Sequence, residues 1–130
     1  MGYESKSGWA IVSDGYLRTN SLQFNTRATA FTGTSTNPFR LDTLNYGYFS
    51  IYTNSGGQYC SLGGGRTGQI VYIWNRNDNQ SFEVCGVVGD DSFTIAGGQM
   101  CAFMYDDNYR YNFGGSTASR WVRISQYDSN

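Results

Sequence analysis

A tyrosine and a tryptophan beside a polar, amide-rich segment form the part of this sequence best suited to bind a ligand. Tyr72 and Trp74 are two positions apart in the apolar run 70–74, so in a strand both side chains point to one side. If the residues between them face the core, both rings face outwards. The polar segment that follows includes Asn79 and Gln80. An exposed indole offers apolar contact and amides select hydroxyl geometry, which together suit a sugar.

The same residues allow a purely structural interpretation. Trp74 can pack against its own hairpin, and residues 75–80 can form an ordinary solvated turn. The residue types alone leave both interpretations open. A second mixed segment, residues 106–111, lacks the ordered spacing of a calcium-binding loop and is expected to be a hairpin tip.

Catalysis and metal binding are not expected. The chain has no His, which removes the commonest general base and the commonest metal ligand. No two acids can be placed together on one face, and isolated acids such as Glu83 and Asp42 are expected to face solvent or lie beside strands. Cys60, Cys85 and Cys101 fit no zinc motif, and Cys60 and Cys101 are expected as small buried hydrophobes. We therefore expect neither an enzyme nor a cofactor.

Charge and hydropathy restrict the partners. The net charge of -1 argues against nucleic acid or an anionic membrane as the main partner, because both require clustered cations. The N-terminal residues lack an apolar run typical of a signal peptide, and no later run could span a bilayer. We expect no membrane insertion, and a cytosolic location is slightly favoured over secretion.

Short strands and glycine turns are expected throughout the chain. Aromatic residues make up 17% of the sequence, and 17 Gly stand against 1 Pro, a balance typical of short-stranded all-β proteins. No window keeps the spacing of an amphipathic helix. Strand-like pairs recur at steps of roughly 40 residues, which indicates internal repeats. Within each repeat two aromatic residues keep the same separation: Phe31 and Phe39, Trp74 and Phe82, Phe113 and Trp121.

Three units of four strands, arranged around an axis, are typical of a β-trefoil. One unit alone could not bury its apolar face, whereas three together could. We therefore predict a single all-β domain, residues 1–130, with repeats over roughly 7–45, 46–88 and 89–130. Phe31, Phe39, Phe82, Phe113 and Trp121 are expected to fill the barrel and its cap.

The second unit resembles the ricin-B-type lectins, sugar-binding β-trefoils whose repeats end in a Gln-x-Trp motif. The resemblance is carried by Phe49-Ser50-Ile51, Tyr59-Cys60-Ser61-Leu62, the glycine loop 63–65, Ile70-Val71-Tyr72-Ile73-Trp74 and Asn79-Gln80-Ser81-Phe82. Phe82 stands where the motif has Trp. The outer units keep only the aromatic residue of the motif.

The resemblance implies a shallow sugar site in this unit. It places Trp74 at the position that stacks on the sugar ring and Asn79, just before Gln80, at the hydroxyl-binding amide. Tyr72 lies where these lectins often have Gln, and Ser61 occupies the place of the Asp that grips adjacent hydroxyls in galactose binders. The disulfide that the family forms within a repeat is missing.

The sequence therefore predicts a metal-independent lectin that binds glycans or glycoconjugates. Because only the second unit has candidate sugar-binding residues, multivalent binding would come from a homo-oligomer. The alternative is a β-trefoil interaction module, such as a protease inhibitor or a cytoskeletal cross-linker, that uses its long loops.

Overall fold

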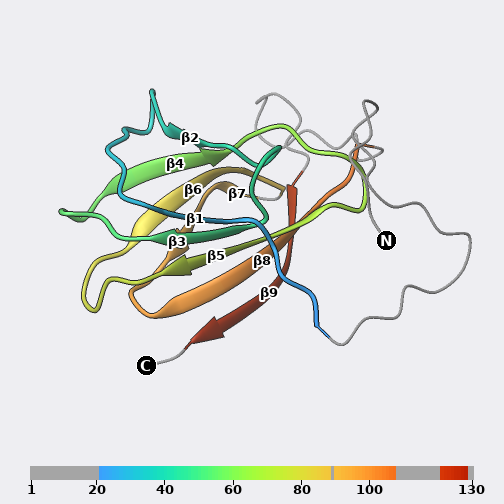
Figure 1. The fold of residues 1–130 in the computed structure, drawn as a ribbon. Helices are drawn as coiled ribbons and strands as arrows, with labels where there is room; N and C mark the ends of the chain where they lie inside the picture. Colours follow the sequence, from blue (N-terminus) through green and yellow to red (C-terminus); the bar gives the residue numbers. More distant parts are fainter. Residues whose placement is uncertain (1–20, 89, 108–120, 129–130) are drawn as a thin grey trace, which may run out of the picture.

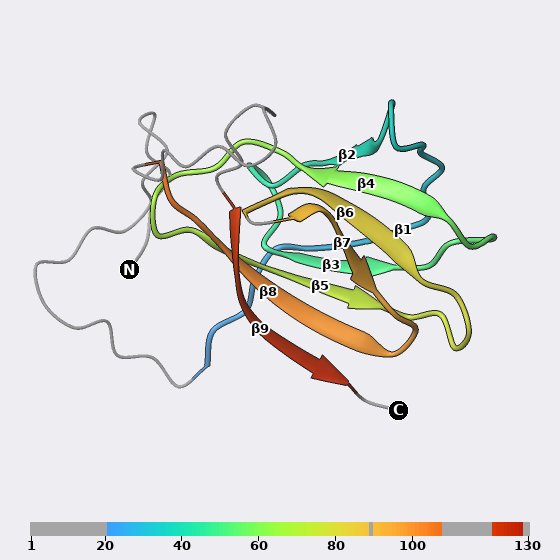
Figure 2. The same cartoon turned by 180° about the vertical axis from the view of Figure 1, so that it is seen from behind.

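The protein is an all-β molecule, as the sequence predicts. The computed structural model describes residues 21–88, 90–107 and 121–128, and the strands lie in one strongly curled, mixed sheet that resembles half a barrel (Figures 1 and 2). The described strands are β1 (Thr26–Thr29), β2 (Phe39–Leu41), β3 (Tyr48–Ile51), β4 (Gln58–Leu62), β5 (Ile70–Asn75), β6 (Phe82–Val87), β7 (Asp90–Ile95), β8 (Gln99–Tyr105) and β9 (Trp121–Asp128).

The first six strands form two rows of parallel neighbours. Strands β1, β3 and β5 pair in parallel, and so do β2, β4 and β6. The chain passes from one row to the other after every strand, so it winds as stacked coils. The stack is in register: Thr26 pairs with Tyr48, which pairs with Tyr72. The coil repeat is roughly half the period suggested by the aromatic pairs.

Antiparallel strands close one end of this stack. β7 pairs with β6, and β8 pairs with both β5 and β9. At its start β9 also reaches the other row, where Trp121 pairs with Val87 of β6. This contact joins the β1–β3–β5–β8–β9 side to the β6–β4–β2 side and curls the sheet, as Figure 1 shows for β6, β8 and β9.

The core lies on the concave side of the curl. Along β5, buried and half-buried residues alternate, as expected for a strand with one face in a core. Fully burying an aliphatic or aromatic side chain of this kind contributes about 1.5–3 kcal/mol. The largest fully buried apolar side chains are Phe49, Phe82, Phe103, Leu41, Ile51, Ile73, Ile95, Val71, Val84 and Val87.

The four of these aromatic residues that the structure describes, Phe31, Phe39, Phe82 and Trp121, pack in or against the core, as expected. Phe31 stacks on Phe39 with ring centroids 5.6 Å apart and meets the edge of Phe82 at 5.4 Å. Trp121 is buried and its indole nitrogen donates a hydrogen bond to the Gly63 carbonyl at 2.8 Å. Phe113 lies outside the described residues.

The described strands show no trefoil repeats and form one mixed, curled sheet. The consecutive strands β3 and β4, on either side of the turn 54–57, do not pair with each other but lie in different rows and pair with other strands. The turn is instead a corner of a coil, with Gly57 at a φ of 71°. Alternating short strands bury the same side chains in a hairpin or in a parallel coil, so alternation does not distinguish the two. Much of the expected first and third repeats, including residues 7–20 and 108–120, lies outside the description.

Candidate ligand-binding face

The outer side of β5 presents the two aromatic residues singled out above. Val71 and Ile73 are 0% exposed, and the residues that alternate with them, Tyr72 and Trp74, are half-buried. Alternation along the strand therefore turns both rings away from the core. Parallel pairing of β5 with β3 determines which side chains of β3 lie beside these two rings.

Tyr72 and Trp74 have neighbours on both adjoining strands. On β3, Tyr48 lies beside Tyr72 and Ser50 lies beside Trp74. On the other side, β8 places Met100 beside Trp74. Neighbouring strands are about 4.8 Å apart, so these side chains are close enough to form one surface.

We call the outward residues Tyr48, Tyr52, Tyr72 and Trp74 the aromatic face. Tyr48 and Tyr52 alternate with buried Phe49 and Ile51 along the chain, and Tyr52 is 46% exposed. The face therefore combines one indole with three phenol rings that carry hydroxyl groups. Its rings belong to two adjacent, rigidly paired segments.

The two ends of the aromatic face have different neighbours. The ring of Phe24, in the segment before β1, lies 5.4 Å from that of Tyr72 at an interplanar angle of 51°. On the Trp74 side, Ser50 of β3 and Met100 of β8 lie in register with the indole, and Ser50 is only 7% exposed. Phe24 therefore supports the Tyr72 end of the face, and Ser50 and Met100 flank the Trp74 end.

Asn79 and Gln80 lie in the turn between β5 and β6. The Asn79 side chain is exposed, whereas Gln80 is half-buried and its backbone carbonyl accepts a hydrogen bond from Asn75 Nδ2 at 2.8 Å. The side-chain Oε1 of Gln80 is buried without a hydrogen-bond partner in the described part of the chain. Of the two amides, Asn79 is therefore the one presented to solvent.

Ser61 is not brought together with Trp74. It lies on β4, beside Arg40 of β2 and Cys85 of β6, and next to fully buried Cys60 in the chain. In the sheet order β4 and β5 are far apart, because β6, β9 and β8 lie between them. The five candidate residues therefore separate into Tyr72 and Trp74 on one strand, two amides in the next turn, and Ser61 on the opposite row.

Sequence reasoning missed Tyr48, Ser50 and Tyr52, of which Tyr48 lies beside Tyr72 and Ser50 beside Trp74. A signal for them exists, because Tyr48, Ser50 and Tyr52 alternate with two strongly apolar residues. Alternation predicts that they face outwards, but only the parallel register places them beside β5.

Potential metal ligands are scattered. Within residues 21–88, 90–107 and 121–128, no group of three or more Cys, Asp and Glu side chains could hold a metal ion. Cys60, Cys85 and Cys101 are free thiols, and burial raises the pKa of all three. No helix among these residues is long and apolar enough to cross a membrane.

Comparisons with known proteins assign the chain to no family. No family model matches it, and no curated protein does. One solved structure that it is similar to is described as the structure of a chaperone-substrate complex, with a TM-score of 0.48 and 15% sequence identity. That match covers 78% of this chain but 17% of the other, so the chain spans less than a fifth of the length of that protein.

Proposed function

We propose that this protein is a non-enzymatic carbohydrate-binding protein whose ligand lies across the aromatic face. The observation that carries the proposal is the placement of Tyr72 and Trp74 on the outer side of β5, with Tyr48 and Ser50 beside them in register. The proposal keeps the sugar chemistry of the lectin resemblance and does not depend on a β-trefoil.

The chemistry of the face suits a sugar. Indole and phenol rings provide flat apolar surfaces for the C–H faces of pyranose rings, and a preformed ring loses little conformational entropy on binding. The hydroxyl groups of Tyr48 and Tyr72 can donate to or accept from sugar hydroxyls. Asn79, exposed in the next turn, adds an amide that can do both.

The shape of the face favours a chain of sugars over a single residue. Tyr72 and Trp74 are two positions apart on one strand, a separation of about 6.6 Å. Rings at this spacing, with Tyr48 on the adjacent strand, contact successive units of an extended oligosaccharide. Several such contacts together also compensate for the weak binding of each one.

A glycan array followed by calorimetric titration of the hits tests the proposal. Trp74→Ala is expected to raise the Kd for a bound oligosaccharide at least about tenfold, equivalent to about 1.4 kcal/mol. Trp74→Phe, which keeps a flat ring, should retain most of the affinity. Tyr59→Ala is the matched control, because Tyr59 is a half-buried aromatic on β4, in the opposite row.

Two results would overturn the proposal. One is the absence of binding to any glycan on the array at millimolar protein. The other is a glycan that binds Trp74→Ala and Tyr72→Ala as tightly as the unaltered chain. Tight inhibition of a protease without glycan binding would support the alternative of an interaction module.

A further inference from the structure

In the described part of the chain, no strand follows β1 or β2 at one end of the stack of coils. Among the described residues β1 pairs only with β3, and β2 only with β4, so each row ends in a strand with one free edge. Free edges expose backbone N–H and C=O groups that can pair with another strand. The opposite end of the stack is closed by β7, β8 and β9.

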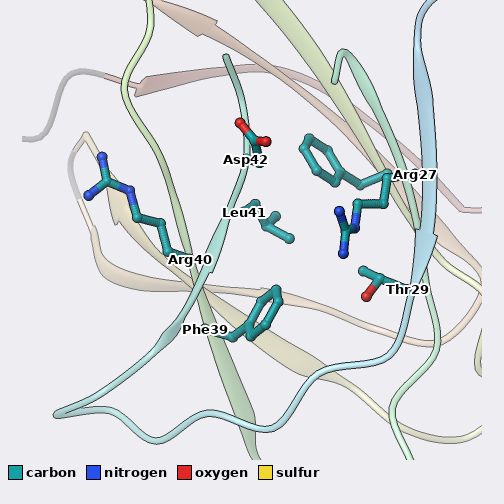
Figure 3. A pocket seen from close by; sticks show the side chains of 7 residues that line it. Arg27, Thr29, Phe39, Arg40, Leu41 and Asp42 are labelled. Atoms are coloured by element: carbon teal, nitrogen blue, oxygen red, sulfur yellow. The ribbon is translucent and has the colours of Figure 1, made fainter. Parts of the chain in front are cut away.

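A cavity of about 110 Å³ lies between the two free edges. Figure 3 shows Phe39 and Leu41 of β2 pointing into it, opposite Arg27 and Thr29 of β1. Phe49, one coil further in, contributes to its lining. Arg40 and Asp42 complete the lining, so three apolar side chains share the cavity with two cations, one hydroxyl and one carboxylate.

Arg27 occupies an unusual position at the mouth of this cavity. It is in register with Phe49, which is in register with Ile73, and both of these apolar residues are 0% exposed. Arg27 thus continues an inward-facing apolar column with a cation, and Figure 3 shows its side chain turned towards Thr29 and the cavity. Its guanidinium carbon lies 5.5 Å from the centre of the Tyr46 ring.

No described carboxylate forms an ion pair with Arg27. The nearest acid along the rim, Asp42, accepts hydrogen bonds from the backbone and side-chain nitrogens of Asn45, at 3.3 and 2.8 Å. An exposed cation needs no partner while the end of the stack is open to water. A strand added to β1 would bury it, and a buried cation requires an opposite charge.

We propose that this open end binds an extended peptide strand that carries an acidic side chain. The peptide pairs with the free edge of β1 as a further parallel strand, and its carboxylate enters the cavity beside the Arg27 guanidinium. Main-chain hydrogen bonds provide affinity, and the charge pair selects the residue in register with Arg27.

A second copy of this chain fits the open end poorly. The free edges are Thr26–Thr29 and Phe39–Leu41, which contribute Arg27 and Arg40 and no acid. Pairing these edges between two copies brings cations together, and like charges on facing strands are destabilising. The charge of the edge therefore favours an acidic strand from another protein.

Synthetic peptides test this inference directly. The probe is a capped peptide of alternating Thr and Val with a single central Glu, and its partner has Gln in place of Glu. We expect the Glu peptide to bind the full chain at least about tenfold more tightly than the Gln peptide, as measured by calorimetry. Arg27→Gln should abolish this preference, and Arg76→Gln, the same change at an exposed position after β5, should leave it intact.

A charge-reversal variant distinguishes loss of the charge pair from a nonspecific loss of binding. Arg27→Glu should bind a Lys version of the peptide better than the Glu version. The inference fails if neither peptide binds, if Glu and Gln peptides bind equally, or if Arg27→Gln keeps the preference for Glu. It also fails if sedimentation shows that the unaltered chain dimerises and that the dimer blocks the peptide, because a second copy would then be the occupant.

Discussion

The side-chain nitrogen of Asn75 donates a hydrogen bond to the backbone carbonyl of Ile95, at 2.9 Å, across the inside of the curled sheet. The same nitrogen lies 2.8 Å from the Gln80 carbonyl, and Asn75 Oδ1 accepts the backbone N–H of Asn77 at 3.0 Å. Asn75 is 0% exposed. One buried amide therefore links the end of β5, the following turn and the end of β7.

Replacing this amide is expected to cost stability. Asn75→Ala leaves the Gln80 and Ile95 carbonyls and the Asn77 amide without a partner away from water, and each such group costs about 1–3 kcal/mol. We expect the free energy of unfolding to fall by about 3 kcal/mol in urea titrations. Asn79→Ala, in the exposed part of the same turn, should change it by less than about 0.5 kcal/mol. Equal losses for both variants would contradict this role of Asn75.

Gly33 is expected to tolerate no side chain. It lies in the loop between β1 and β2, and a Cβ there would overlap the Tyr59 carbonyl oxygen and lie 2.5 Å from the Phe39 nitrogen. Both are backbone atoms, so neither can rotate away. Gly33→Ala should therefore lower the free energy of unfolding by more than about 2 kcal/mol.

Gly56 is the control for this substitution. It is exposed in the corner after β3, and an added Cβ would meet nothing within 4 Å. Gly56→Ala should leave the free energy of unfolding within about 0.5 kcal/mol. Thermal unfolding of both variants would show whether the close approach at Gly33 is real, since a stable Gly33→Ala protein would refute it.

The all-β class could be predicted from the sequence, but the topology could not. Alternating residues such as those of β5 identify a strand and its buried face. They do not identify the neighbouring strand, because hairpins and parallel coils use the same alternation. The equal spacing of Phe31 and Phe39 and of Trp74 and Phe82 suggested a long repeat, whereas Phe31 contacts both Phe39 and Phe82 within one core.

The candidate site could be predicted along one strand only. The outward direction of Tyr72 and Trp74 follows from local alternation. The resemblance added Ser61, which the register places on the opposite row, and it omitted Tyr48, which parallel pairing brings alongside. Contacts between strands distant in sequence depend on register, and one sequence does not fix that register.

The buried thiols are expected to lower the free energy of unfolding as the pH becomes alkaline. Burial raises the pKa of Cys101 from 9.0 to about 11, with Arg123 opposing the rise, and burial raises the pKa of Cys60 as well. The unfolded chain then loses these protons at lower pH than the folded chain, so it binds fewer protons above pH 9. The contribution to stability is complete below pH 9 and is lost as the pH rises through about 11.

Urea titrations across this pH range would measure the effect. Cys101→Ala should have a shallower fall of the free energy of unfolding between pH 9 and about 11 than the unaltered chain, because one of the shifted groups is gone. The comparison uses slopes, so a loss of stability at neutral pH from the smaller side chain does not affect it. Identical slopes would show that Cys101 titrates alike in both states.

The separation of Ser61 from Trp74 predicts which substitutions affect sugar binding. Tyr72→Ala removes a ring of the aromatic face and should raise the Kd for a bound oligosaccharide about tenfold. Ser61→Ala, on β4 in the opposite row, should leave the Kd within about twofold. Ser50→Ala, beside Trp74 but only 7% exposed, should also leave the Kd within about twofold. If Ser61→Ala instead weakens binding as much as Tyr72→Ala, the ligand contacts the β4 side, and the aromatic face is not the site.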